Sequence, residues 1–236
     1  AFNLPLYVAF PLCHPTRMLF ATTPALFSCP TPGTYRIGAS GDYPTINAAV
    51  QSLSGCTITG AYVFEFQADY HSQAESFPII IPAIAGASVS NTLTFRPALG
   101  VSTVIRSAAT GVFLFQGADF IRLDGRSGGQ GNSINLTLEN TSVGSVYTLQ
   151  LNQDATQNSV RYCRILGAST VNTTGTVVFG SQLVASGNDD NLVEYCAIGD
   201  ASSGTPLNGI YARGGSTLGV PGYNSGNIIQ HNAIYN

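Results

Sequence analysis

The chain has 236 residues, and only 9% of them are charged, against roughly 25% in an average soluble domain. All nine basic residues are arginine, the formal net charge is −3, and no basic run occurs, which excludes a nucleic-acid-binding surface built on phosphate contacts. A hydrophobic content of 44% excludes wholesale disorder, and no apolar run approaches the ~20 residues that a membrane-spanning helix needs. These values indicate a neutral, β-rich, extracytoplasmic domain.

Residues 1–32 differ in composition from the rest of the chain. They hold six of the twelve prolines and no acidic residue. One interpretation is an export segment, with Arg17, an apolar run from Met18 and small residues before Cys29. The other is an apolar arm that lies on the body of the protein or on a partner. Because Cys13 and Cys29 share this irregular segment, we predict that they form a disulfide.

Residues 43–53, YPTINAAVQSL, predict a short helix. Pro44 suits a first helical turn, and four apolar residues share one helical face: Ile46, Ala49, Val50 and Leu53. Such a helix is suited to cap the open N-terminal end of a β-structure. Residues 61–67, AYVFEFQ, predict the first strand of the body, and the alternation leaves open which set of side chains faces the core.

Three copies of a short motif organise the body, residues 33–236. They are NSVRYCRI at 158–165, NLVEYCAI at 191–198 and NIIQHNAI at 227–234, and their starts lie 33 and 36 residues apart. A weaker copy, DFIRLDGR, occupies 119–126, and a separate β-type run precedes each copy. The spacing of apolar residues within the motif requires a corner between two short strands. A strand, a corner and a strand, repeated about every 33 residues, predict an all-β fold, namely a right-handed parallel β-helix.

Equivalent residues stack in such a solenoid, because successive coils lie ~4.8 Å apart. We expect a ladder of side-chain amides at one corner, formed by Asn158, Asn191 and Asn227. We expect an inward-facing column at the next corner, formed by Cys163, Cys196 and Asn232. The two cysteines of this column are predicted to be buried free thiols.

The ordered motifs of residues 33–236 resemble a known group. GTYRIGASGDYPTINAAVQSL, FPIIIPAIAGASVSNTLTFRPA, ADFIRLDG and the N-x-V-x-Y-C-x-I copies are similar to secreted right-handed parallel β-helix proteins of the pectate-lyase-like superfamily. More narrowly, they resemble large surface proteins that some bacteria export through the type IX system. The resemblance implies the fold and export to the cell surface or the medium, and it implies no particular reaction. The segment 43–53 also resembles the opening of pectin esterases and lyases.

The sequence offers few groups for chemistry. β-Helix enzymes need carboxylates grouped with arginine or lysine on an outward sheet face, either for acid–base roles or to hold calcium. The acidic doublet Asp189–Asp190 precedes the Asn191 corner, and its two interpretations are a Ca²⁺ site and a solvated turn. No other cofactor is predicted. Sugar-binding candidates on the upstream strands are Tyr147, Gln150, Tyr211 and Arg213, with ordinary solvent-facing positions as the alternative.

The repeat is strong, but the sequence shows no group of carboxylates with arginine or lysine that could carry out catalysis, so we predict no catalytic residue. We therefore expect a non-catalytic, exported surface protein: an adhesin-like spacer, a carbohydrate-contacting protein or an assembly subunit. The alternatives are a β-helix polysaccharide lyase or glycoside hydrolase, and an accessory subunit of an envelope complex. The expected partners are polysaccharide or other envelope proteins, bound through residues 1–32 and the open C-terminal coil. Self-association is also expected, because edge strands without lysine lack the charges that oppose strand addition.

Overall fold

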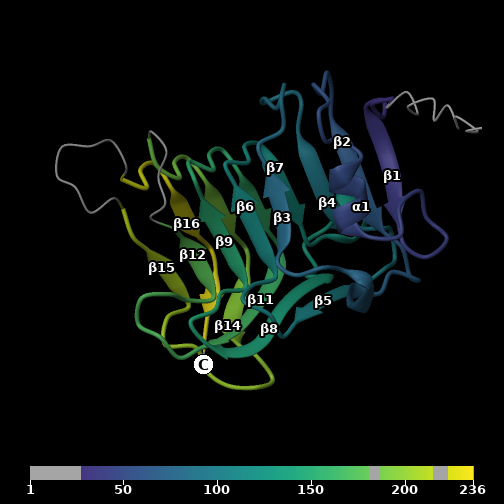
Figure 1. Ribbon diagram of the computed structural model, residues 1–236. Helices are drawn as coiled ribbons and strands as arrows, with labels where there is room; N and C mark the ends of the chain where they lie inside the picture. Colours follow the sequence, from purple (N-terminus) through teal and green to yellow (C-terminus); the bar gives the residue numbers. More distant parts are fainter. Residues whose placement is uncertain (1–27, 181–185, 215–222, 236) are drawn as a thin grey trace, which may run out of the picture.

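The fold is a parallel β-solenoid. The computed structural model describes residues 28–180, 186–214 and 223–235, and within them all pairings between strands are parallel (Figure 1). Sheet colours run in sequence order from purple to yellow across the molecule, because each coil lies directly beside the previous one (Figure 1). The predicted all-β parallel β-solenoid is confirmed.

The strands form three sheets. Sheet A contains, in spatial order, β1 (Gly33–Ile37), β2 (Tyr62–Phe66), β4 (Leu93–Pro97), β7 (Ile121–Asp124), β10 (Ser159–Arg161), β13 (Leu192–Glu194) and β16 (Ile228–Gln230). Sheet B contains β5 (Thr103–Ser107), β8 (Leu136–Gly144), β11 (Cys163–Ser169), β14 (Ala197–Asp200) and β17 (Ala233–Ile234). Sheet C contains β3 (Ile79–Pro82), β6 (Phe113–Gln116), β9 (Leu149–Asn152), β12 (Val177–Phe179) and β15 (Ile210–Ala212).

Each full coil passes through sheets A, B and C in that order, as β7, β8 and β9 do. In the first coil a 3₁₀ turn, η1 (Ser72–Ala74), lies beside β5 where a strand of sheet B would otherwise stand. A second 3₁₀ turn, η2 (Ser127–Gly129), follows β7 and contacts β4. The corner between sheets A and B is only one or two residues long in the later coils, as between β10 and β11, whereas other connections are longer.

The core consists of side-chain files that run along the solenoid axis. In sheet A the inward positions pair in register from coil to coil, and the central file is Phe64, Phe95, Leu123, Val160 and Val193. All five are at most 1% exposed, and the rings of Phe64 and Phe95 stack with centroids 5.1 Å apart. Burial of side chains of this size stabilises a fold by about 1.5–3 kcal/mol each. In β2 the inward set is therefore Tyr62, Phe64 and Phe66.

An asparagine ladder lines the corner before sheet A. The Oδ1 atom of Asn191 accepts hydrogen bonds from the backbone N–H and the side-chain amide of Asn158, at 2.9 and 3.0 Å. Asn227 accepts the equivalent two bonds from Asn191. Asn158, Asn191 and Asn227 thus stand in one file, with the first two only 2% exposed. A second ladder, which the sequence reasoning missed, joins Asn188 to Asn224 at 2.8 Å.

The predicted cysteine column also stands in one file. Cys163 and Cys196 are buried free thiols on neighbouring coils, and the Oδ1 atom of Asn232 accepts a hydrogen bond from the backbone N–H of Cys196. Each thiol lies closest to the carbonyl oxygen two residues earlier, Cys163 to Arg161 at 3.2 Å and Cys196 to Glu194 at 3.3 Å. Each also contacts a carbonyl oxygen of the preceding coil. The thiols therefore pack as small apolar side chains with weak donors.

The helix predicted at 43–53 is present as the shorter α1 (Ile46–Gln51). Thr45 is its N-cap and accepts a hydrogen bond from the N–H of Ala48, so Pro44 lies outside the first turn. The buried carboxylate of Glu75 accepts the N–H groups of Ile46 and Asn47. These contacts satisfy donors that a helix start leaves unpaired. The helix contacts β3, the end strand of sheet C.

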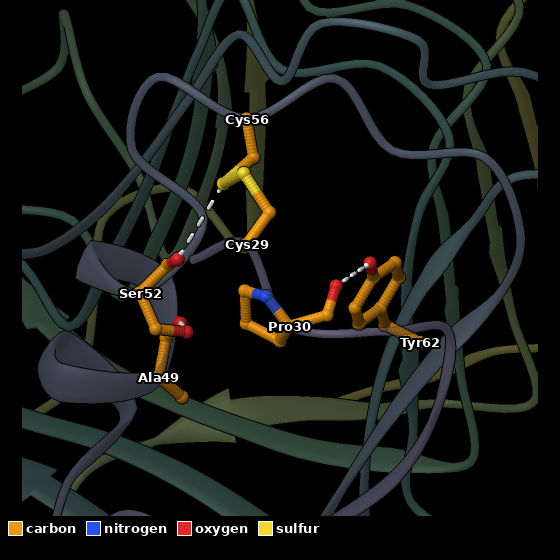
Figure 2. Close-up of a disulfide and its surroundings, with 6 residues drawn as sticks. All are labelled: Cys29, Pro30, Ala49, Ser52, Cys56 and Tyr62. Carbon is orange, nitrogen blue, oxygen red and sulfur yellow. Dashed lines mark hydrogen bonds between the residues drawn. A yellow bond between two sulfur atoms is a disulfide. The ribbon is translucent and has the colours of Figure 1, made fainter. Parts of the chain in front are cut away.

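The predicted Cys13–Cys29 disulfide is wrong, because Cys29 is bonded to Cys56 (Figure 2). Cys56 lies in the turn that follows α1, and its sulfur contacts the carbonyl oxygen of Ser52. The carbonyl oxygen of Pro30, the residue after Cys29, accepts a hydrogen bond from the hydroxyl of Tyr62 at 2.6 Å. Residues near in sequence suggested the wrong pair, whereas the fold brings Cys29 to a cysteine 27 positions downstream. Cys13 itself lies outside the described residues.

Candidate ligand-binding groove

The outward face of sheet A carries charges of alternating sign. Its register pairs Arg36 with Glu65, Glu65 with Arg96, Asp124 with Arg161, Arg161 with Glu194 and Glu194 with Gln230. Ion pairs join Arg96 to Glu65 at 2.7 Å and Arg161 to Glu194 at 2.9 Å. In a chain with so few charges, this one file holds three arginines and three carboxylates. Most of these charges therefore neutralise one another along the sheet.

Asp124 is engaged by Arg126 rather than by its neighbours in the file. The guanidinium of Arg126 donates to both carboxylate oxygens, at 2.8 and 2.7 Å. This hydrogen bonding with Asp124 raises the pKa of Arg126 above its usual value. The guanidinium also lies over the ring of Tyr162, 4.9 Å from its centroid. Both side chains are thus fixed in place beside the strand end.

Arg122 is the exception on this face. Register places it on the second outward file of sheet A, between Thr94 and Ser159. Its side chain is exposed. Within the part of the chain that the structure describes, no acidic side chain forms an ion pair with it. Arg122 is therefore the arginine of this face that lacks an ion-pair partner among the described residues.

The face is hollowed into a groove of about 640 Å³ centred on these residues. Outward side chains of sheet A, from Val63 on β2 to Leu192 on β13, form its floor. One wall contains three residues that precede successive strands and share a left-handed backbone: Phe120, Gln157 and Asp190. The opposite wall contains Arg126 and Gly129. A side chain at position 129 would collide with the guanidinium of Arg96, so glycine leaves room for that arginine.

The residues predicted to contact sugar lie on or beside sheet C. Gln150 and Tyr211 stand on one outward file of sheet C, with Val178 between them. Tyr147 lies at the turn before β9, over Gly111, and burial raises the pKa of its hydroxyl. Arg213 follows β15 and is exposed. All four therefore lie on or beside sheet C, and their role in sugar binding stays a prediction.

The acidic doublet lies at the corner before β13. The carboxylate of Asp189 accepts the backbone N–H of Ser225 in the next coil, and Asp190 adopts a positive φ of 54° and lines the groove. Across residues 28–180, 186–214 and 223–235, no three His, Cys, Asp or Glu side chains are grouped closely enough to hold a metal ion. The carboxylate of Asp189 thus links two coils, and the choice between a Ca²⁺ site and a solvated turn stays a prediction.

Sequence reasoning missed the groove because it misaligned the weak motif copy. Alignment by appearance matched Asp119 to Asn158 and Asp124 to Cys163, whereas the register pairs Asp124 with Arg161, two positions away. One signal was available in the strong copies: their fourth residues are Arg161, Glu194 and Gln230. That position faces outward in every coil, so a charged file could have been predicted from it.

Comparisons with protein-family models, with curated protein sequences and with solved structures found no match to the chain. Among the described residues, no helix has both the length and the apolar character needed to cross a membrane.

Proposed function

We propose that this protein is a non-catalytic, exported surface component that binds an anionic polysaccharide in the groove over sheet A. The observation that carries the proposal is Arg122, whose exposed guanidinium has no ion-pair partner among the described residues. A guanidinium binds a carboxylate or sulfate through two parallel hydrogen bonds. Hydroxyl and amide groups beside it, from Thr94, Ser159 and Gln157, suit the hydroxyls of a sugar.

The shape of the groove favours an extended polymer. Its lining runs from β2 to β13, which are separated by four strand spacings along the solenoid axis. At ~4.8 Å per spacing, this is a length of roughly 19 Å. A groove of that length and open form matches several consecutive units of a linear chain better than a single small molecule.

The carboxylates on the face favour binding over catalysis. Glu65 and Asp124 are two strands apart in sheet A, or about 10 Å along the axis, which is wider than the spacing of the two acids in most glycoside hydrolases. Glu65 and Asp124 are also both held by arginines. A β-helix lyase or hydrolase is the second candidate, and Arg122-dependent release of new chain ends from a polysaccharide would favour it.

Export is part of the proposal. The Cys29–Cys56 disulfide supports it, because disulfides persist mainly in oxidising compartments. The resemblance to type IX-exported β-helix proteins points the same way, as does a polar surface made largely of hydroxyl and amide groups. A role as accessory subunit of an envelope complex is compatible with the same groove, which would then hold the complex on its polysaccharide.

The binding proposal is tested by titrating the protein with oligogalacturonate and with a neutral oligosaccharide of equal length. Arg122→Ala is expected to weaken oligogalacturonate binding at least ~10-fold, because a charge-assisted hydrogen bond contributes about 1.5–3 kcal/mol. Arg164→Ala is the matched control, since Arg164 is exposed on sheet B and also has no ion-pair partner among the described residues. Equal weakening by both variants, or by neither, would contradict the proposal.

A polypeptide of these 236 residues is also expected to self-associate end-on. In β16 and β17, Ile229 and Ile234 are 44% and 57% exposed, whereas their register partners Val193 and Ile198 are buried. Sedimentation velocity over a wide concentration range should detect oligomers, and the double substitution Ile229→Asn with Ile234→Asn should reduce them. A parent protein that stays monomeric at every concentration would refute this expectation.

A further inference from the structure

A column of planar side chains follows the corner between sheets A and B. Tyr162, Tyr195 and His231 occupy the same place in three successive coils, directly after β10, β13 and β16. The rings of Tyr162 and Tyr195 are 4.9 Å apart with an interplanar angle of 14°. Those of Tyr195 and His231 are also 4.9 Å apart, at 6°. The guanidinium of Arg126 covers the free face of Tyr162 and extends the column by one more planar group.

The backbone at these positions is unfavourable for large side chains. The three residues have φ values of 52°, 53° and 54°, a left-handed conformation that is unfavourable for a non-glycine residue. The equivalent residue of the preceding coil is Gly125, where an added Cβ would collide with the carbonyl oxygen of Tyr162. Glycine or asparagine would suit all three corners better. Two tyrosines and a histidine occupy them instead, at a cost to stability.

A second groove, of about 400 Å³, runs beside the column. The three rings line one side of it, and Asn132 and Ile134 line the other. Small side chains, Ala197 and Ala233, leave its floor open. Tyr195 is 40% exposed, and the described residues provide no hydrogen-bond partner for the hydroxyl of Tyr162 or of Tyr195. The two tyrosine hydroxyls therefore lie one coil apart without a hydrogen-bond partner among the described residues. Below them, Ala197 and Ala233 form a shallow apolar floor.

We propose that the column and the second groove bind a neutral glycan chain that runs along the solenoid axis. The phenol hydroxyls, the imidazole and the Asn132 amide would exchange hydrogen bonds with sugar hydroxyls. Ile134 and the two alanines would pack on the apolar face of the sugar rings. No acidic side chain lines this groove, and Asp124 already balances the charge of Arg126, so a neutral ligand fits better than an anionic one. This site is separate from the sheet A groove and does not depend on the function proposed for it.

The test is calorimetric titration with cellohexaose, chitohexaose and laminarihexaose, three neutral hexasaccharides. At least one should bind the parent protein, and Tyr195→Ala should weaken that binding at least ~10-fold. Tyr195→Phe keeps the stacked ring and the fold but removes the hydroxyl, and the loss of one neutral hydrogen bond should weaken binding about 5-fold. Tyr223→Ala is the matched control, since Tyr223 is 54% exposed and lines neither groove, and this variant should bind as the parent does.

The proposal is overturned if none of the three glycans binds, or if Tyr195→Ala weakens binding no more than Tyr223→Ala does. It is also overturned if Arg122→Ala abolishes the binding of the neutral glycan. That last result would place all glycan binding in the sheet A groove and would leave the proposed function standing. Loss of anionic binding alone in Arg122→Ala, with neutral binding intact, supports two separate sites.

Discussion

Asn191→Ala is expected to lower the free energy of unfolding by about 4 kcal/mol. The side chain of Asn191 accepts two hydrogen bonds from Asn158 and donates to Ala155 and Asn227, all at 2.9–3.0 Å. Alanine removes these four bonds and leaves polar groups of two neighbouring coils buried without partners, each of which costs more than an exposed one. Denaturant unfolding followed by circular dichroism measures the loss.

The matched control is Asn172→Ala. Asn172 is an exposed asparagine outside the ladder, so its substitution should change stability by less than ~0.5 kcal/mol. If Asn191→Ala is no more destabilising than Asn172→Ala, the ladder does not hold the coils together.

Loss of the Cys29–Cys56 disulfide is expected to destabilise the protein by about 3.5 kcal/mol. The bond joins residues 27 positions apart, and closing a loop of this length restricts the unfolded chain by roughly that free energy. The double substitution Cys29→Ser with Cys56→Ser should therefore lower the unfolding midpoint strongly. Measurement with and without a reducing agent gives an internal check, since the reductant should destabilise the parent and leave the double variant unchanged.

Cys13→Ser separates this pairing from the one that sequence proximity predicted. With Cys29 bonded to Cys56, the Cys13→Ser variant should keep the stability and the reductant sensitivity of the parent. A Cys13→Ser variant that behaves like the double variant would restore the Cys13–Cys29 bond and would remove the one assigned here.

The fold could be predicted from the sequence because the repeat marks both the corners and the strands of each coil. Asn158, Asn191 and Asn227 mark the same corner, and apolar residues at fixed distances after them mark two strands that meet there. No single copy is decisive, but three in-phase copies leave few other architectures. The helix at 46–51 was predictable for a similar reason, because its apolar spacing changes from the period of a strand to that of a helix.

The groove could not be predicted because it depends on register, which the weakest copy obscures. A shift of two residues at 119–126 moves Asp124 from an inward corner to the outward charged file and hides its relation to Arg161. The role proposed for Arg122 depends on the absence of a carboxylate partner among the described residues. Sequence alone does not show which arginines form an ion pair with a carboxylate. The tyrosines at 162 and 195 were visible in the motif, but only the left-handed corner turns their rings outward into one column.

The account is tested most directly by a crystal structure of the protein with a bound oligogalacturonate. We predict that the chain lies along the solenoid axis over β4, β7 and β10, with one carboxylate within hydrogen-bond distance of the Arg122 guanidinium. Saturated crystals that hold the ligand on sheet B, on sheet C or beside the tyrosine column, with Arg122 free, would contradict the assignment of the sheet A groove.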